Sequence, residues 1–194
     1  YGLGIRTGDY DHTREDLFVV EFVKQHSWRL LHDGHELMTV TLGQPKLAVP
    51  IISKEYFQEH FRRHISRSPM ATSDLLYELI RATARLSHGA LLVISNRAEQ
   101  EAQRLGGQAV RVRPFPMSVD DISRLTSIDG AVVIDTAGIC HALGVILDGA
   151  VVKIGQAARG ARYNSALRYI QAARKRRHKC IAVVVSEDGN VSLL

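Results

Sequence analysis

Asp129-Gly130-Ala131-Val132-Val133-Ile134 is a carboxylate and a glycine at the entrance of a short, fully apolar run. Apolar runs of this length between turn residues are typical of buried β-strands. Further along the chain, residues 160–166 begin with glycine and open an amphipathic segment. A carboxylate at a strand entrance can hold a metal ion, and a glycine turn with an arginine at a helix N-terminus can hold phosphates. Together the two motifs predict a nucleotide site.

The region from residue 89 onward alternates apolar runs with segments of helical spacing. The apolar runs, which we predict to be strands, are residues 91–94, 109–112, 128–134, 138–147 and 181–185. The predicted helices are residues 98–105, 119–125 and 162–177. Such alternation is typical of a sheet that helices cover on both faces. We therefore predict an α/β fold with a mixed, mostly buried sheet, in which residues 128–134 and 138–147 pair as a hairpin.

The N-terminal part of the chain has a different pattern. Two β-type runs, residues 17–23 and 36–42, lie on either side of a turn signal at residues 32–34. Runs of this kind separated by a glycine turn predict paired strands. We expect a small strand-rich lobe with Trp28 in its core.

Two helices are expected after this lobe. Aromatic and aliphatic residues at helical spacing predict one over residues 54–65, and Thr72-Ser73-Asp74 is expected to cap the next. The composition changes near residue 70. We therefore predict a β-rich N-terminal lobe over residues 1–70, with a sensory role, and a nucleotide-binding domain over residues 71–194.

Composition and charge bound the class of protein. The chain has 194 residues, is 45% hydrophobic and carries a formal net charge of +5. No apolar stretch reaches the roughly 20 residues that a membrane span needs, and no basic segment followed by an apolar one begins the chain, so we expect a cytoplasmic protein. The basic run at residues 174–179 closes a predicted helix, where cations complement the helix dipole. We interpret this run as a solvated helix end and disfavour nucleic-acid binding.

Cysteines and histidines give weaker signals. Cys140 and Cys180 each lie in an apolar stretch, so we expect reduced core thiols. His60 and His64 are four residues apart on one helical face, where a solvated or stacked pair is favoured over a metal site. Hydrolysis through Cys140 and His141 is disfavoured because adjacent strand residues point to opposite faces.

Four ordered motifs together resemble a known family. Residues 89–194 resemble the diadenylate cyclase domain found in the DNA integrity scanning protein and its relatives, which join two ATP molecules into cyclic di-AMP. Residues 89–94 match the first strand of that family, and residues 129–131 match its Asp-Gly-Ala motif. Residues 160–166 occupy its Gly-Thr-Arg-His-Arg-Ala-Ala position, and residues 185–189 resemble its Val-Ser-Glu-Glu segment.

The resemblance implies a role for each motif. Asp129 would bind the divalent metal, Mg²⁺ or Mn²⁺, and the expected catalytic residues are Asp129, Arg162 and Glu187. The expected contacts to ATP would come from the motif residues and from an apolar residue whose backbone meets adenine. They are Gly130, Ala131, Ile146, Gly160, Ala161, Arg162, Tyr163, Asn164, Ser165, Ser186 and Glu187.

The resemblance also implies a reaction and an assembly. The 3′-hydroxyl of one ATP would attack the α-phosphorus of the other, and pyrophosphate would leave in line. Each protomer would hold one ATP, so catalysis would require a face-to-face homodimer, at least transient, or a higher homo-oligomer.

The chain departs from the family pattern at three places. Residues 162–164 are Arg-Tyr-Asn where the family has Arg-His-Arg, Ala161 replaces a threonine, and residues 146–149 replace a Leu-Pro-Leu-Ser loop. Tyrosine and asparagine can donate hydrogen bonds but carry no positive charge at neutral pH. Arg159 could restore one cation. We favour a diadenylate cyclase, and the alternative is a catalytically silent module that binds ATP or a related nucleotide as a sensor.

Overall fold

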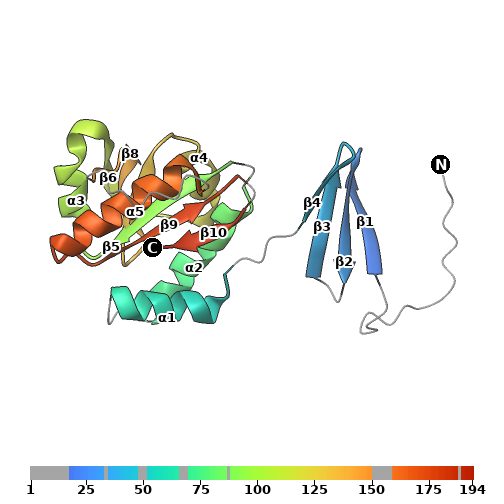
Figure 1. Ribbon diagram of the computed structural model, residues 1–194, viewed down its shortest axis with the longest axis horizontal. Helices are drawn as coiled ribbons and strands as arrows, with labels where there is room; N and C mark the ends of the chain where they lie inside the picture. Colours follow the sequence, from blue (N-terminus) through green and yellow to red (C-terminus); the bar gives the residue numbers. More distant parts are fainter. Residues whose placement is uncertain are drawn as a thin grey trace, which may run out of the picture. The chain divides into compact units, whose positions relative to one another are not determined.

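The computed structural model describes residues 18–32, 35–47, 52–65, 70–86, 88–149, 159–187 and 189–194 (Figure 1). The chain divides into two compact units between residues 49 and 50. Among the described residues, no helix is long and apolar enough to cross a membrane.

The first unit is a four-stranded antiparallel sheet in which sequential strands are neighbours. Its strands are β1 (Phe18–Lys24), β2 (Ser27–His32), β3 (His35–Thr41) and β4 (Gln44–Leu47). The two predicted β-type runs are therefore confirmed as β1 and β3. Trp28 lies half-buried on β2, and Ser27 and Val40 are the buried residues among those described here. The expectation of Trp28 in a closed core is wrong, because a single layer of strands encloses nothing.

The second unit contains a six-stranded sheet in the order β10-β9-β5-β7-β8-β6. Its strands are β5 (Ala90–Ser95), β6 (Val110–Pro116), β7 (Ala131–Asp135), β8 (Ile139–Val145), β9 (Cys180–Val185) and β10 (Val191–Leu193). β5 and β7 are parallel, and the other neighbours are antiparallel. The mixed sheet and the β7–β8 hairpin are both confirmed.

Helices cover both faces of this sheet (Figure 1). The helices are α1 (Lys54–His64), α2 (Met70–Ala84), α3 (Ala98–Arg104), α4 (Ile122–Leu125) and α5 (Gly160–Lys175), with the short 3-10 turns η1 (Gly106–Gln108) and η2 (Val119–Asp121). Leu92 and Ile94 pack with α1, α2 and α4, whereas Leu91 and Val93 pack with α3 and α5. This alternation along β5 follows from the pleat of the strand and confirms the predicted α/β fold.

Two details at the start of the second unit differ from the sequence expectation. The helix α1 packs in the core of the second unit, so the division of the chain lies earlier than residue 70. The helix α2 begins at Met70, so the expected cap at Thr72-Ser73-Asp74 lies inside the helix. Asp74 instead accepts a hydrogen bond from Gln58 at 2.8 Å and pairs with Lys54 at 3.1 Å. These polar side chains hold α2 against α1.

The cysteines and the histidine pair behave as predicted. Cys140 and Cys180 are free and buried, and burial raises the pKa of Cys140 to about 11. The rings of His60 and His64 stack with centroids 4.2 Å apart. Among the described residues, no group of three or more side chains is arranged to hold a metal ion.

Candidate nucleotide site

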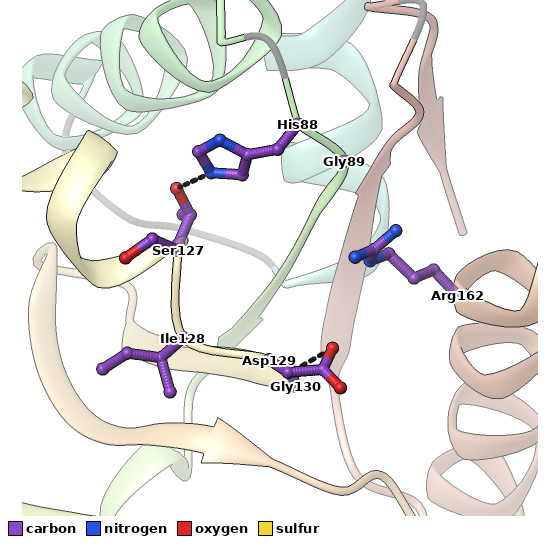
Figure 2. Close-up of a pocket in the computed structure, with 8 residues that line it drawn as sticks. His88, Gly89, Ser127, Ile128, Asp129, Gly130 and Arg162 are labelled. Carbon is purple, nitrogen blue, oxygen red and sulfur yellow. Dashed lines mark hydrogen bonds between the residues drawn. The ribbon is translucent and has the colours of Figure 1, made fainter.

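A pocket lies where the N-terminal ends of β5 and β7 meet the first turn of α5 (Figure 2). It has a volume of about 520 Å³ and is lined by His88, Gly89, Thr126, Ser127, Ile128, Asp129, Gly130 and Arg162. Because β5 and β7 are parallel, the residues that precede them come together at one edge of the sheet. Topology therefore joins two sequence motifs that lie far apart in the chain.

Asp129 stands at the entrance of β7 in a tightly packed turn. Gly130 has a φ of +111°, and a Cβ there would lie 2.7 Å from the carbonyl oxygen of Gly144 and 2.8 Å from its Cα. Only glycine fits this backbone approach. The Gly130 amide donates a hydrogen bond to Oδ1 of Asp129 at 3.1 Å, and the Asp129 side chain is exposed. The turn thus holds an accessible carboxylate at the pocket.

Arg162 reaches the same pocket from α5. Figure 2 shows its guanidinium and the Asp129 carboxylate facing a common space. A Cβ at residue 89 would lie 2.9 Å from Nη1 of Arg162, so Gly89 makes room for the guanidinium beside β5. The same Nη1 lies 3.8 Å from Oε1 of Glu187. The pocket therefore brings one anionic and one cationic group to an open space, with a second carboxylate beside the cation.

Three other residues expected in the site do not line this pocket. They are Ala131, Ile146 and Ser186. Ser186 forms a turn with Asn190, whose amide donates to Oγ of Ser186 at 3.1 Å. Ala131 is fully buried in the core between the sheet and α3 and α5. Ile146 is 62% exposed after the end of β8 and does not line the pocket. Residues 150–158, which follow it, lie outside the described residues.

Tyr163 and Asn164, which differ from the family motif in the first turn of α5, contact residues of that same turn. Gly160 has a φ of +78° and open space where a Cβ would stand. The side chain of Asn164 donates a hydrogen bond to the carbonyl of Gly160 at 2.9 Å. The guanidinium of Arg159 lies 5.0 Å from the ring centre of Tyr163. Ala161 is exposed and Ser165 is half-buried, and neither lines the described pocket.

His88 lines the pocket but was not identified from the sequence. Its Nε2 lies 3.1 Å from Oγ1 of Thr126, and that hydroxyl donates its own proton to the carbonyl of Ile122 at 2.6 Å. The hydroxyl must therefore accept from the imidazole, which fixes the proton of His88 on Nε2. The only signal was its place next to Gly89 before a strand, and the contact to Thr126 depends on tertiary structure.

Solved structures share this fold. A double mutant of DacA from Staphylococcus aureus is 19% identical, with a TM-score of 0.51 over 64% of this chain and 83% of that one. A hypothetical membrane-spanning protein from Bacillus cereus is 18% identical, with a TM-score of 0.52 over 71% of this chain and 66% of that one. A comparison with curated proteins gives no match.

The sequence profile of one family matches residues 78–194, the part of the chain that contains the six-stranded sheet and the pocket. The match includes the Asp129 turn and the first turn of α5. By this match over more than half of its length, the chain belongs to the family of DisA bacterial checkpoint controller nucleotide-binding domains.

Proposed function

We propose that this protein is a diadenylate cyclase, which condenses two ATP molecules into cyclic di-AMP and releases pyrophosphate. The observation that carries the proposal is that Asp129, Gly130 and Arg162 line one pocket in a chain of this family. A carboxylate and a guanidinium on opposite sides of an open space suit a metal-bound triphosphate. We also propose that it acts in the cytoplasm.

The site fits a divalent cation held largely by its substrate. Asp129 offers an exposed carboxylate in a rigid turn, and Mg²⁺ and Mn²⁺ are commonly bound through one or two carboxylates together with substrate phosphates and water. Asp129 would hold Mg²⁺ or Mn²⁺, which when bound would neutralise charge on the α-phosphate.

Arg162, Glu187 and the first turn of α5 also have roles in this proposal. Arg162 binds the triphosphate, and its contact with Glu187 sets the direction of the guanidinium. The α5 amides near Gly160 add donors for phosphate oxygens. The 3′-hydroxyl of each ATP loses its proton to water and attacks the α-phosphorus of the other ATP. Each attack breaks one P–O bond, whose electron pair leaves with pyrophosphate, so that two ATP molecules give cyclic di-AMP and two pyrophosphates. Because each protomer holds one ATP, two pockets must face each other in a homodimer.

One specific observation favours a second candidate, a nucleotide sensor without turnover. Tyr163 and Asn164 replace two cationic or metal-reaching family residues, and both contact their own helix turn. A pocket with one arginine at this turn can bind a triphosphate while stabilising the transition state poorly. Nucleotide binding without condensation would then signal to the N-terminal sheet.

The test is incubation of the protein with ATP and Mn²⁺, with the product identified by mass spectrometry. We expect cyclic di-AMP, and we expect Asp129→Asn to reduce its rate by at least about 100-fold because the metal loses its carboxylate. Glu99→Gln is the matched control. It removes one exposed carboxylate from α3, outside the pocket, and should leave the rate unchanged.

Calorimetry with ATP separates the two candidates. ATP that binds in an Asp129-dependent manner but stays unchanged supports the sensor and contradicts the cyclase. Protein that neither binds nor converts ATP rules out both candidates for this pocket.

A further inference from the structure

The four-stranded sheet of the first unit has one apolar face and one polar face. Residues paired across antiparallel strands point to the same side. The register places nine apolar side chains on one side, which we call the apolar face: Phe18, Val20, Phe22, Trp28, Leu30, Met38, Val40, Pro45 and Leu47. His32 lies on the same side opposite Phe18, with the two ring centroids 4.8 Å apart, and this face carries no Asp, Glu, Lys or Arg among the described residues.

The opposite side of the sheet carries charged side chains beside one apolar pair, Val19 and Leu31. Arg29 pairs with Glu21 at 2.5 Å and with Glu36 at 3.7 Å. Thr39 donates to Glu36 at 2.6 Å. Exposed charges of this kind remain solvated. Only the apolar face therefore needs a covering layer.

The apolar face is exposed along its two outer strands, β1 and β4, and half-buried or buried along β2 and β3. The exposed fractions are 80% for Phe22, 73% for Leu47, 55% for Phe18 and 50% for Val20. No helix occurs among the described residues of this unit. A single sheet with one apolar face gains stability only when a second layer covers that face.

We propose that the apolar face packs against the same face of a second copy of this chain, so that two four-stranded sheets form a sandwich. Antiparallel sheets pack face to face with interdigitated side chains. Under two-fold symmetry the apolar face of one copy would contact the identical face of the other. Neither copy would then place an Asp, Glu, Lys or Arg side chain in the contact.

The exposed area of the apolar face is large enough for contact with a second copy of the chain. The four most exposed side chains together present about 500 Å² on each copy. Two copies would therefore remove about 1,000 Å² from water before the half-exposed side chains are added, which is near the lower limit for a specific interface. The segment at residues 1–17 suits the face less well, because it contains six charged residues among seventeen.

The inference does not depend on the proposed function, although it would serve it. A sheet-to-sheet dimer would hold two cyclase domains at high effective concentration and so favour the encounter of their two pockets.

The first test is the mass of the full chain in solution without nucleotide, by light scattering over a range of concentrations. We expect a dimer that Phe22→Asp weakens by at least about 100-fold, because a buried apolar anchor becomes a charge. Val19→Asp is the matched control. It adds the same charge to the same strand on the polar side and should leave the dimer intact.

A second test does not depend on how Phe22→Asp folds. Met38 and Thr39 are adjacent, both half-buried, and point to opposite sides of β3. Met38→Cys should be joined across copies by a short thiol cross-linker, and Thr39→Cys should not. The existing cysteines are buried.

The proposal is overturned if the wild-type chain is a monomer at every concentration, since another segment or another protein would then cover the face. It is also overturned if the dimer persists unchanged in Phe22→Asp, or if Thr39→Cys cross-links as well as Met38→Cys. Loss of cyclic di-AMP synthesis with an intact Phe22-dependent dimer would count against the cyclase only.

Discussion

The strands β1 and β5 belong to different sheets and are both mostly apolar, but they differ in burial. All six residues of β5 are buried, whereas all seven residues of β1 are exposed. Both strands are rich in valine, leucine, isoleucine or phenylalanine. The difference arises because helices pack on both faces of the six-stranded sheet. A strand of apolar composition can be buried, but it is buried only where another layer packs against it.

The two units can be followed separately in unfolding experiments. Trp28 is the single tryptophan of the chain and lies on β2, so its fluorescence reports on the four-stranded sheet. The described helices all belong to the second unit, so far-ultraviolet circular dichroism at helical wavelengths reports on that unit.

The largest difference between the units is expected for glycine substitutions. Gly130→Ala forces a Cβ against the Gly144 backbone at a φ of +111° and should cost about 4 kcal/mol of unfolding free energy. Gly43→Ala, in the β3–β4 turn, meets no atom within 4 Å at a φ of +78° and should cost about 1 kcal/mol. Denaturant unfolding measures both. Equal costs would show that the Gly130 turn relaxes.

The next effect compares one substitution in the two sheets. Val93→Ala removes two methyl groups from a fully buried site and should lower the stability of the second unit by about 2.5 kcal/mol. Val19→Ala acts at a site that is 40% exposed on the polar side of the first sheet. Its expected cost is below about 0.5 kcal/mol. A large loss in Val19→Ala would mean that the polar side is also covered.

A third comparison concerns carboxylates. Glu101 is 7% exposed and accepts hydrogen bonds from Arg104 at 2.7 Å and from Tyr169 at 2.9 Å. Burial works to raise the pKa of Glu101, but the bonds from Arg104 and Tyr169 outweigh it and the pKa is lowered. Glu101→Gln should cost about 2 kcal/mol. Glu21→Gln breaks the exposed pair with Arg29 and should leave the unfolding free energy nearly unchanged, measured by the same denaturant titrations.

The smallest effect is a pH dependence of the second unit. Burial and the nearby His64 and Arg63 lower the pKa of His60 from 6.5 to about 4. The folded state therefore binds fewer protons than the unfolded state between these values, and stability is lost as the pH falls from 6.5 toward 4. We expect the Tm of the helical signal to drop by about 3 °C between pH 7 and pH 5 because of this group. His60→Gln should reduce the drop, and an unchanged drop would assign it to other groups.

Part of the candidate site could be predicted from local sequence. Asp129 before an apolar strand and Arg162 in the first turn of a helix were both identified from their patterns. Their placement round one pocket depends on the parallel pairing of β5 with β7 and on the packing of α5 against the sheet. His88 was missed because its contact with Thr126 joins residues that are 38 positions apart. Periodicity carries no information about such contacts.

The amino-acid sequence by itself determined the order of strands and helices in the second unit, because period-two and period-3.6 patterns are local properties of the chain. It also determined the family motifs, whose match carries the assignment. Tertiary structure decided which polar residues meet at the pocket, that α1 packs with the second unit, and that the described residues of the first unit form a single sheet without a second layer of their own. These features depend on contacts between segments distant in the chain, and local patterns do not encode them.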